Sequence, residues 1–139
     1  MTPAVFEPIG HLETTHTDPE RMPSQASDSE DIGRAIIDER FVDGLLGLDR
    51  YPFLWLVTWL HDQPDHRPLR LVPRATEATG ELQGVFASRS PVRPNPIGLS
   101  LVRLLGVEGN VVRIAGLDLL DGTWLLDIKP WFADCDLPT

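Results

Sequence analysis

Three apolar runs in the last third of the chain, separated by two turn signals, constrain the fold most strongly. The runs lie in IGLSLVRLLGVEGNVVRIAGLDLLDGTWLLDIKPW, residues 97–131, and the turn signals are EGN and DG. Short apolar runs joined in this way are typical of β-hairpins. The pattern predicts strands at about residues 98–107, 111–117 and 124–128. Short strands at this spacing favour a twisted antiparallel sheet that curls into a barrel.

A further strand is predicted in the middle of the chain. YPFLWLVTWLH, residues 51–61, is rich in aromatic and β-branched side chains and is bounded by Pro52 and by the polar run HDQPDHRP. This composition predicts a buried strand. Trp55 and Trp59 share one face of that strand, and we expect this face to belong to the core.

The remaining elements are predicted to be short. VFEPIGHLE, residues 5–13, favours an edge strand because it contains a proline, and GVFAS, residues 84–88, favours a short strand. Apolar side chains at helical spacing predict an amphipathic helix over Glu39–Leu46. The segment SDSEDIGRAIIDE is compatible with either a helix start or a short strand at residues 35–37. Together the patterns predict one mainly β domain over residues 1–139, a single-sheeted antiparallel β-barrel with one or two short helices.

The distribution of charge restricts the possible partners. The net charge is −9; residues 13–43 hold nine acidic side chains and three arginines, whereas residues 85–103 hold three arginines and no acid. So acidic a chain is not expected to bind nucleic acid through bulk electrostatics. A local pair of arginines can still bind a small anion or a single phosphate.

Targeting and redox signals are absent from the sequence. The longest apolar run, residues 53–60, is too short to cross a bilayer, and the first ten residues lack the pattern of a signal peptide. Cys135 is the single cysteine, so no intrachain disulfide can form. These features favour a cytoplasmic protein. His61 and His66 flank DQPD at a spacing that matches no familiar set of metal ligands, so no metal is expected.

The loop RSPVRPNPIGLS, residues 89–100, is the strongest candidate for a binding site. Its three prolines each fix one φ angle and hold the preceding residue extended, so the loop is rigid before a ligand arrives. The rigid backbone offers two guanidinium groups, a hydroxyl and an amide, from Arg89, Arg93, Ser90 and Asn95. These groups suit a carboxylate, a ribose diol or a phosphate. The alternative is that the loop is only a structural connection whose arginines are solvated.

The sequence resembles the TsaA-like family of TrmO-type tRNA methyltransferases, which use S-adenosylmethionine. The resemblance is densest in GVFASRSPVRPNPIGLSLVRLLGVEGNVVRIAGLDLLDGTWLLDIKPW, residues 84–131, and continues upstream in DERFVDGLLGLDRYPFLWLVTWLHD, residues 38–62. The first part, IGHLETTH followed by MPSQ, is a looser match. There Pro23, Ser24 and Gln25 align with the Pro-Arg-Gln of the family, and Ser24 stands in place of the arginine.

The resemblance implies a compact β-barrel that forms a homodimer with S-adenosylmethionine near the subunit interface. It implies N6-methylation of threonylcarbamoyl-adenosine beside the anticodon of tRNA. The cofactor site carried over from the family, together with the polar residues of the proline-rich loop, comprises Pro23, Ser24, Gln25, His61, Asp62, Arg89, Ser90, Arg93, Asn95, Leu99, Asp118, Leu119, Leu120, Asp121 and Gly122. Asp121 is the candidate for a general base. The chain ends soon after IKPW, so the C-terminal extension of longer family members is expected to be missing.

Two other functions stay open at the level of sequence. The chain could bind S-adenosylmethionine as a sensor or regulatory module without transferring its methyl group. It could instead be a dimeric barrel whose basic loop binds a partner protein. Asp118 and Asp121 also lie in a predicted turn, where aspartate is favoured for its local hydrogen bonds alone.

Overall fold

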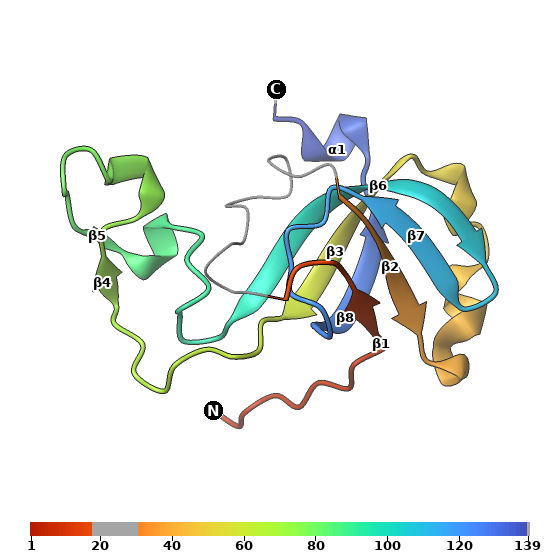
Figure 1. Ribbon diagram of the computed structural model, residues 1–139, viewed down its shortest axis with the longest axis horizontal. Coiled ribbons are helices and arrows are strands. Elements are labelled where there is room, and N and C mark those ends of the chain that lie inside the picture. The colour runs from red at the N-terminus through yellow and green to blue at the C-terminus, as the bar shows by residue number, and fades with distance from the viewer. Residues whose placement is uncertain (18–30, 139) are drawn as a thin grey trace.

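The barrel predicted from the hairpin series is present. A computed structural model of the chain describes residues 1–17 and 31–138 (Figure 1). Six strands close into an antiparallel barrel in the order β1-β2-β7-β6-β3-β8. Their bounds are β1 Gly10–Glu13, β2 Ile32–Ile37, β3 Phe53–Trp59, β6 Ile97–Glu108, β7 Val111–Ala115 and β8 Trp124–Pro130. The strand β8 closes the barrel because it pairs with β3 along one edge and with β1 along the other.

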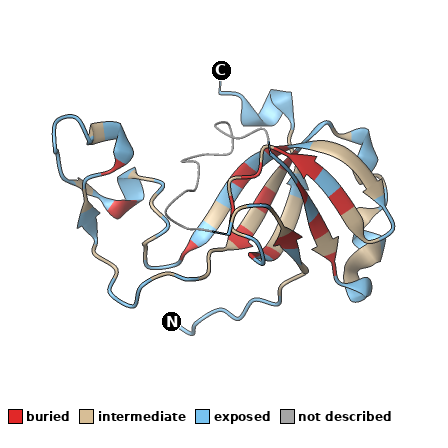
Figure 2. Cartoon of the chain, viewed as in Figure 1, coloured by how far each residue is buried: buried red, intermediate tan, exposed pale blue. Residues whose placement is uncertain are grey.

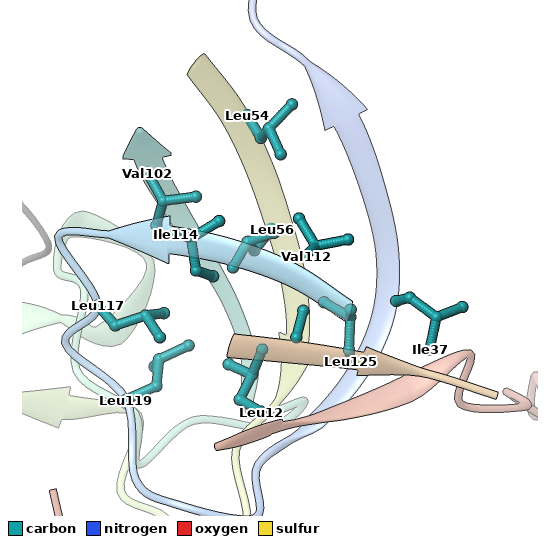
Figure 3. Packing of buried hydrophobic residues seen from close by; sticks show 11 residues of the cluster. Leu12, Ile37, Leu54, Leu56, Val102, Val112, Ile114, Leu117, Leu119 and Leu125 are labelled. Atoms are coloured by element: carbon teal, nitrogen blue, oxygen red, sulfur yellow. The ribbon is translucent and has the colours of Figure 1, made fainter. Parts of the chain in front are cut away.

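The interior of the barrel is filled by aliphatic side chains from alternate positions. In β3, Leu54, Leu56 and Thr58 are fully buried, while the residues between them are partly exposed. The other strands contribute side chains to the same cluster, among them Val102, Val112, Ile114 and Leu125 (Figure 3). Leu117 and Leu119, which lie between β7 and β8, complete the cluster (Figure 3). Figure 2 shows that the buried residues follow the barrel strands.

The prediction that Trp55 and Trp59 belong to the core is wrong. Both tryptophans face the outside of the barrel, opposite in phase to the buried Leu54 and Leu56. The indole of Trp55 donates a hydrogen bond to Asp136 Oδ2 at 3.1 Å. β3 is apolar on both faces, so alternation alone could not decide which set points inward. Six strands leave a narrow interior that accepts leucine more readily than tryptophan.

Of the two turn signals in the sequence, EGN forms a hairpin and DG does not. EGN joins β6 to β7 as a hairpin, as expected. DG does not form a hairpin, because β7 pairs with β6 and β2 whereas β8 pairs with β3 and β1. Residues 116–123 therefore cross the end of the barrel between two strands that are not neighbours. In SDSEDIGRAIIDE, whose pattern is compatible with a helix start or a strand, residues 32–37 form the strand β2.

The shorter elements also depart in part from the expected pattern. The N-terminal strand is β1, a member of the closed barrel and not an edge, because β8 covers its second side. The predicted helix at residue 39 is a 3-10 helix, η3 Glu39–Leu45, followed by a second, η4 Leu48–Arg50. GVFAS is not a strand: Val85–Ala87 form the 3-10 helix η6. A single helical turn, α1 Ala133–Asp136, lies near the C-terminus.

A separate lobe was not foreseen from the sequence. Between β3 and β6 the chain forms a two-stranded sheet of β4 Arg70–Leu71 and β5 Gln83–Gly84, with the 3-10 helix η5 Arg74–Thr76 between them. This lobe, residues 62–88, projects away from the barrel (Figure 1). We call it the arm.

Candidate functional site

The described segments that are predicted to bind a cofactor attach to one end of the barrel. In the register of the sheet, Trp59 at the end of β3 lies opposite Ile97 at the start of β6 and Trp124 at the start of β8. His61 and Asp62 follow β3, residues 89–96 precede β6, and residues 118–122 precede β8. We call this end of the barrel the β3 end. Pro23, Ser24 and Gln25 lie outside the described residues, in the segment that connects β1 to β2.

The flanks of that segment are joined at the same end. His16 Nε2 lies 3.0 Å from Asp31 Oδ2 and 3.2 Å from the carbonyl oxygen of Leu117. Thr14 Oγ1 donates to the carbonyl oxygen of Leu119 at 2.9 Å. Both flanks of the segment between β1 and β2 therefore contact residues 117–119 or a residue bound to them.

The proline-rich loop is held by hydrogen bonds from its own side chains. Arg93 Nη1 donates to the carbonyl oxygens of Ser88 and Ser90 at 3.0 and 3.1 Å, and Ser90 Oγ accepts from the backbone N–H of Val92 at 3.2 Å. Arg93 therefore spans the bend of the loop and fixes its shape. Arg89, by contrast, is exposed at the entrance to the loop, directly after η6 and Ser88.

Sequence reasoning missed Arg67, which fixes the loop from the other side. Arg67 Nη1 donates to the carbonyl oxygens of Arg93 and Pro94 at 3.4 and 3.2 Å, and its Nε donates to Pro64 at 3.1 Å. These bonds tie the base of the arm to the proline-rich loop. No sequence signal could have found this contact, because it joins two irregular segments 26 residues apart.

His61 and Asp62 lie beside the end of the loop. The backbone N–H of Leu60 donates to Pro96 O at 2.7 Å, which continues the β3–β6 pairing for one more residue. His61 Nδ1 is buried and has no hydrogen-bond partner among the described residues, while Nε2 lies 3.5 Å from Asp62 Oδ2. Asp62 has a φ of 60°, the only positive φ of a non-glycine residue in the described chain. Strained backbone and an unpartnered buried polar atom are features of ligand sites.

The strand β6 contributes one inward and one outward side chain to this end. Ser100 points inward and its Oγ donates to Asp118 Oδ1 at 3.1 Å, which links β6 to residues 118–122. Leu99 points outward and is 62% exposed. Gly98 leaves room for Thr58, because a Cβ at Gly98 would lie 2.5 Å from Thr58 Oγ1.

Residues 118–122 form a bend fixed against the end of β1. The backbone N–H of Thr14 donates to Asp121 Oδ1 at 3.0 Å, and the N–H of Asp121 donates to His16 O at 2.8 Å. Gly122, with a φ of 82°, donates through its N–H to Leu12 O at 2.8 Å. One carboxylate oxygen of Asp121 thus helps to stabilise the bend. Leu119 packs into the core, so that residue offers a ligand only its backbone.

Aromatic side chains line the outside of the same end. Trp59 and Trp124 are paired in the register of β3 and β8, and Trp124 is 53% exposed. The ring of Phe6 lies 6.4 Å from that of Trp59. A groove of about 740 Å³ begins at Trp124 and runs over the outer surface of β1 and β2, lined also by His11, Ile36 and Asp38. Of the described residues expected at the cofactor site, the groove includes Gly122 alone.

The described residues contain neither a cluster of metal ligands nor a helix that could cross a membrane. Nowhere in residues 1–17 and 31–138 do three or more histidine, cysteine, aspartate or glutamate side chains gather as they would around a metal ion. None of the described helices has the length and apolar character needed to cross a membrane.

Known proteins resemble this chain over nearly all of its length. Residues 11–137 match the family described as the tRNA-methyltransferase O N-terminal domain. A protein of Pyrococcus abyssi named as a probable S-adenosyl-L-methionine-binding protein is 39% identical over 133 residues, which cover 95% of this chain and 70% of that protein. The mouse tRNA (adenine(37)-N6)-methyltransferase is 38% identical over 138 residues, 95% of this chain and 32% of that protein.

A solved structure agrees with these similarities. The crystal structure of TrmO from Pseudomonas aeruginosa superposes with a TM-score of 0.80 at 33% identity and covers 99% of this chain. The chain spans 58% of that solved protein and about a third of the mouse enzyme. Sequence and structure agree over nearly the whole chain, and the chain belongs to the tRNA-methyltransferase O N-terminal domain family.

Proposed function

We propose that the chain binds S-adenosylmethionine at the β3 end of the barrel. The observation that carries the proposal is the meeting, at one end, of segments from four separate parts of the sequence. His61, Arg89 and Asp118 lie in three of them, and the described flanks of the segment between β1 and β2, at His16 and Asp31, are the fourth. Relatives that are named as S-adenosyl-L-methionine-binding proteins, two of which are covered to 92% of their length, support the same cofactor.

The side chains at this end fit the polar groups of the cofactor. The guanidinium of Arg89 would bind the α-carboxylate, and Asp62 or Asp118 would bind the ammonium group or the ribose diol. His61 Nδ1, buried without a described partner, is a further group that a ligand would satisfy. The exposed faces of Trp59 and Trp124 would attract a positively charged sulfonium. The bound cofactor supplies a methyl group that is already activated, so this chain has mainly to hold the donor and acceptor in line.

We propose tRNA as the methyl acceptor, and the exocyclic N6 of threonylcarbamoyl-adenosine beside the anticodon as the atom that is methylated. The name of the mouse relative, a tRNA (adenine(37)-N6)-methyltransferase, supports adenine N6 in tRNA. Asp121 would accept the proton that the nitrogen loses. Its Oδ1 accepts a hydrogen bond from Thr14, so the proton would go to the second carboxylate oxygen.

A second candidate function is that of a sensor that binds S-adenosylmethionine without transferring its methyl group. Several relatives are named for cofactor binding alone, and this observation favours the sensor. The chain also spans only 58–60% of the solved TrmO chains that it matches.

One pair of measurements separates the candidates. Calorimetry with S-adenosylmethionine tests the cofactor, and incubation with methyl-labelled cofactor and bulk tRNA tests the transfer. Binding together with label in the RNA supports the methyltransferase. Binding without label supports the sensor. Absence of binding contradicts both and leaves the barrel with a basic loop that binds a partner protein.

We further propose that the chain is a homodimer and that the cofactor lies near the subunit interface. The outer surface of β3 and β6 supports an interface, because apolar residues continue across paired strands there. Leu99 lies opposite Val57, and Leu101 lies opposite Trp55. Leu99 is 62% exposed and Leu101 is 38% exposed. A continuous apolar surface of this kind is typical of a contact with another molecule.

A further inference from the structure

The positive charge of this acidic protein is concentrated in the stretch that runs from the arm through the proline-rich loop into β6. Residues 66–103, which comprise most of the arm, the proline-rich loop and the first half of β6, hold six of the twelve arginine and lysine side chains but only two of the 21 acids. The net charge of this stretch is therefore about +4, while the whole chain carries −9. The six arginines are Arg67, Arg70, Arg74, Arg89, Arg93 and Arg103, and the two acids are Glu77 and Glu81.

Two of these arginines, Arg70 and Arg74, are exposed to solvent. Neither has an ion pair or a side-chain hydrogen bond among the described residues. In the β4–β5 ladder, the residue opposite Arg70 is Gly84, so no side chain across the ladder packs against the guanidinium. In contrast, Arg34 and Arg40, on the barrel and in η3, are neutralised by Glu13, Glu7 and Asp38.

In the sequence, an exposed aromatic residue lies between the arm arginines and Arg89. Phe86, in η6, is 79% exposed, and it precedes Arg89 by three residues. The arm also exposes Leu69, Val72 and Leu82, and covering an exposed phenylalanine with a partner is favourable because its apolar surface leaves water. Unpaired nucleotide bases stack on such side chains, while neighbouring arginines bind the phosphates.

The arm is fixed relative to the candidate site. Arg67 ties its base to Arg93 and Pro94, and the N–H of Val85 donates to Leu69 O at 2.8 Å and continues the pairing of β4 with β5. Surface held in this way loses little conformational entropy when it binds a ligand.

From these observations we propose that the arm is the RNA-binding surface of this chain. Arg70 and Arg74 bind phosphates of the RNA backbone, and Phe86 stacks on one unpaired base. The acceptor nucleotide then lies toward Arg89 and the β3 end. This inference rests on the proposed function in taking tRNA as the substrate. The acidic remainder of the chain repels RNA, so the positive charge concentrated in residues 66–103 also orients the complex.

A matched pair of double variants tests the proposal. Arg70→Glu/Arg74→Glu changes the arm, and Arg50→Glu/Arg113→Glu makes the same change of charge at exposed arginines of η4 and β7. Binding of bulk tRNA is measured by filter retention across a series of salt concentrations. We expect the arm variant to bind tRNA at least tenfold more weakly than the control, with the slope of log K against log salt reduced by about 1.4 to 1.8 for two lost phosphate contacts.

The stacking residue is tested separately. We expect Phe86→Ala to weaken tRNA binding about five- to 150-fold without changing the salt slope, because a lost stacking contact releases no counterions. Calorimetry with S-adenosylmethionine should give the same affinity for all these variants as for the parent, and their melting temperatures should match, since each changed side chain is exposed.

Four outcomes would overturn the inference. One is equal loss of tRNA binding in the arm and control variants. A second is a parent protein that binds S-adenosylmethionine but no tRNA at low salt. A third is arm variants that retain tRNA but sediment as monomers where the parent is a dimer, which would assign the arm to contact with a second copy. A fourth is a loss of cofactor affinity equal to the loss of tRNA affinity. If the parent binds tRNA through the arm but no S-adenosylmethionine, the proposed cofactor fails and the inference about the arm stands.

Discussion

Arg89 and Arg93 carry the same charge four residues apart, yet the structure gives them different environments. Arg93 donates to the carbonyl oxygens of Ser88 and Ser90 and thereby fixes the loop. Arg89 is exposed at the entrance to the loop. The sequence predicted both as ligands of an anion. The structure adds that Arg93 also has a role in shaping the loop, and the two roles can be measured separately.

We expect Arg89→Ala to weaken the binding of S-adenosylmethionine and to leave the fold unchanged. A hydrogen bond to a charged group contributes about 1.5–3 kcal/mol, which corresponds to about a 10–150-fold change in dissociation constant. Calorimetry measures the affinity, and thermal unfolding checks the fold. Arg103→Ala is the control, because Arg103 is exposed on β6, opposite Phe53 and away from the β3 end. Equal cofactor affinity in both variants and the parent would contradict the role of Arg89.

Gly98 should tolerate no side chain, unlike Gly106 in the same strand. A Cβ at Gly98 would lie 2.5 Å from Thr58 Oγ1 and 3.0 Å from Leu60 Cδ2, whereas a Cβ at Gly106 would meet nothing within 4 Å. We expect Gly98→Ala to lower the free energy of unfolding by about 1–3 kcal/mol through overpacking. Gly106→Ala should change it by much less. Urea denaturation compares the two, and equal stability would show that Thr58 can move aside.

At the scale of elements, the proline-rich loop depends on side chains as well as on its prolines. We expect Arg93→Ala to speed amide hydrogen exchange at Val92 and to weaken cofactor binding, because the bend between Ser88 and Arg93 loses its hydrogen bonds. Arg89→Ala should leave that exchange rate unchanged. Exchange measured by NMR distinguishes the two arginines. Unchanged protection of Val92 in Arg93→Ala would mean that the prolines alone hold the loop.

The start of η3 provides a test by pH. The backbone N–H of Arg40, and then its guanidinium, lower the pKa of Asp38 below its ordinary value of 3.8. A carboxyl group whose pKa is lower in the folded state stabilises the protein above its unfolded pKa, and this contribution is lost as the pH falls through the folded pKa. We therefore expect Asp38→Asn to be slightly less stable than the parent at pH 7 and equally stable once the pH is below the folded-state pKa of Asp38, where the carboxyl group is protonated.

Urea midpoints at the two pH values measure this difference. Asp49→Asn, in the first turn of η4, is the matched control and should equal the parent at both. A deficit in Asp38→Asn that persists at low pH would contradict the assignment to charge.

Elements with a strong internal pattern were predictable from the sequence, and those defined by tertiary contacts were not. The spans of β3, β6 and β7 follow from apolar runs and the EGN turn. The DG dipeptide favours a hairpin, but β7 and β8, the strands on either side of it, pair with other strands and not with each other. GVFAS has the composition of a strand, yet the preceding β5 already fills the place opposite β4.

For the candidate site, sequence and resemblance predict the proline-rich loop and residues 118–122 as binding segments, and the structure attaches both to the β3 end. The contacts that shape them were not foreseen. Arg67 reaches the loop across 26 residues, and Ser100 reaches Asp118 across the interior of the barrel. Contacts of this kind depend on the closed topology, which no local pattern encodes.

At the scale of the whole molecule, the outer surface of β3 and β6 leads to a prediction about assembly. We expect Leu101→Glu to separate the proposed dimer, because it places a charge in the middle of the apolar surface. Sedimentation should change from twice 15.5 kDa for the parent to 15.5 kDa for the variant. Arg113→Glu, on β7, should remain a dimer. A parent that sediments as a monomer at micromolar concentration would contradict the proposed interface.

The closure of the barrel has a consequence for how the protein is made. The strand β1, near the N-terminus, pairs with β8, near the C-terminus, so the first barrel strand to leave the ribosome waits for the last one. Until residue 130 is synthesised, β1 and β3 each present an unpaired edge, and such edges are prone to join other chains. Contacts of such long sequence separation also slow folding. The interval of greatest risk during synthesis is therefore the one before β8 is complete, and nascent chains stopped before β8 should be the form that chaperones bind most often.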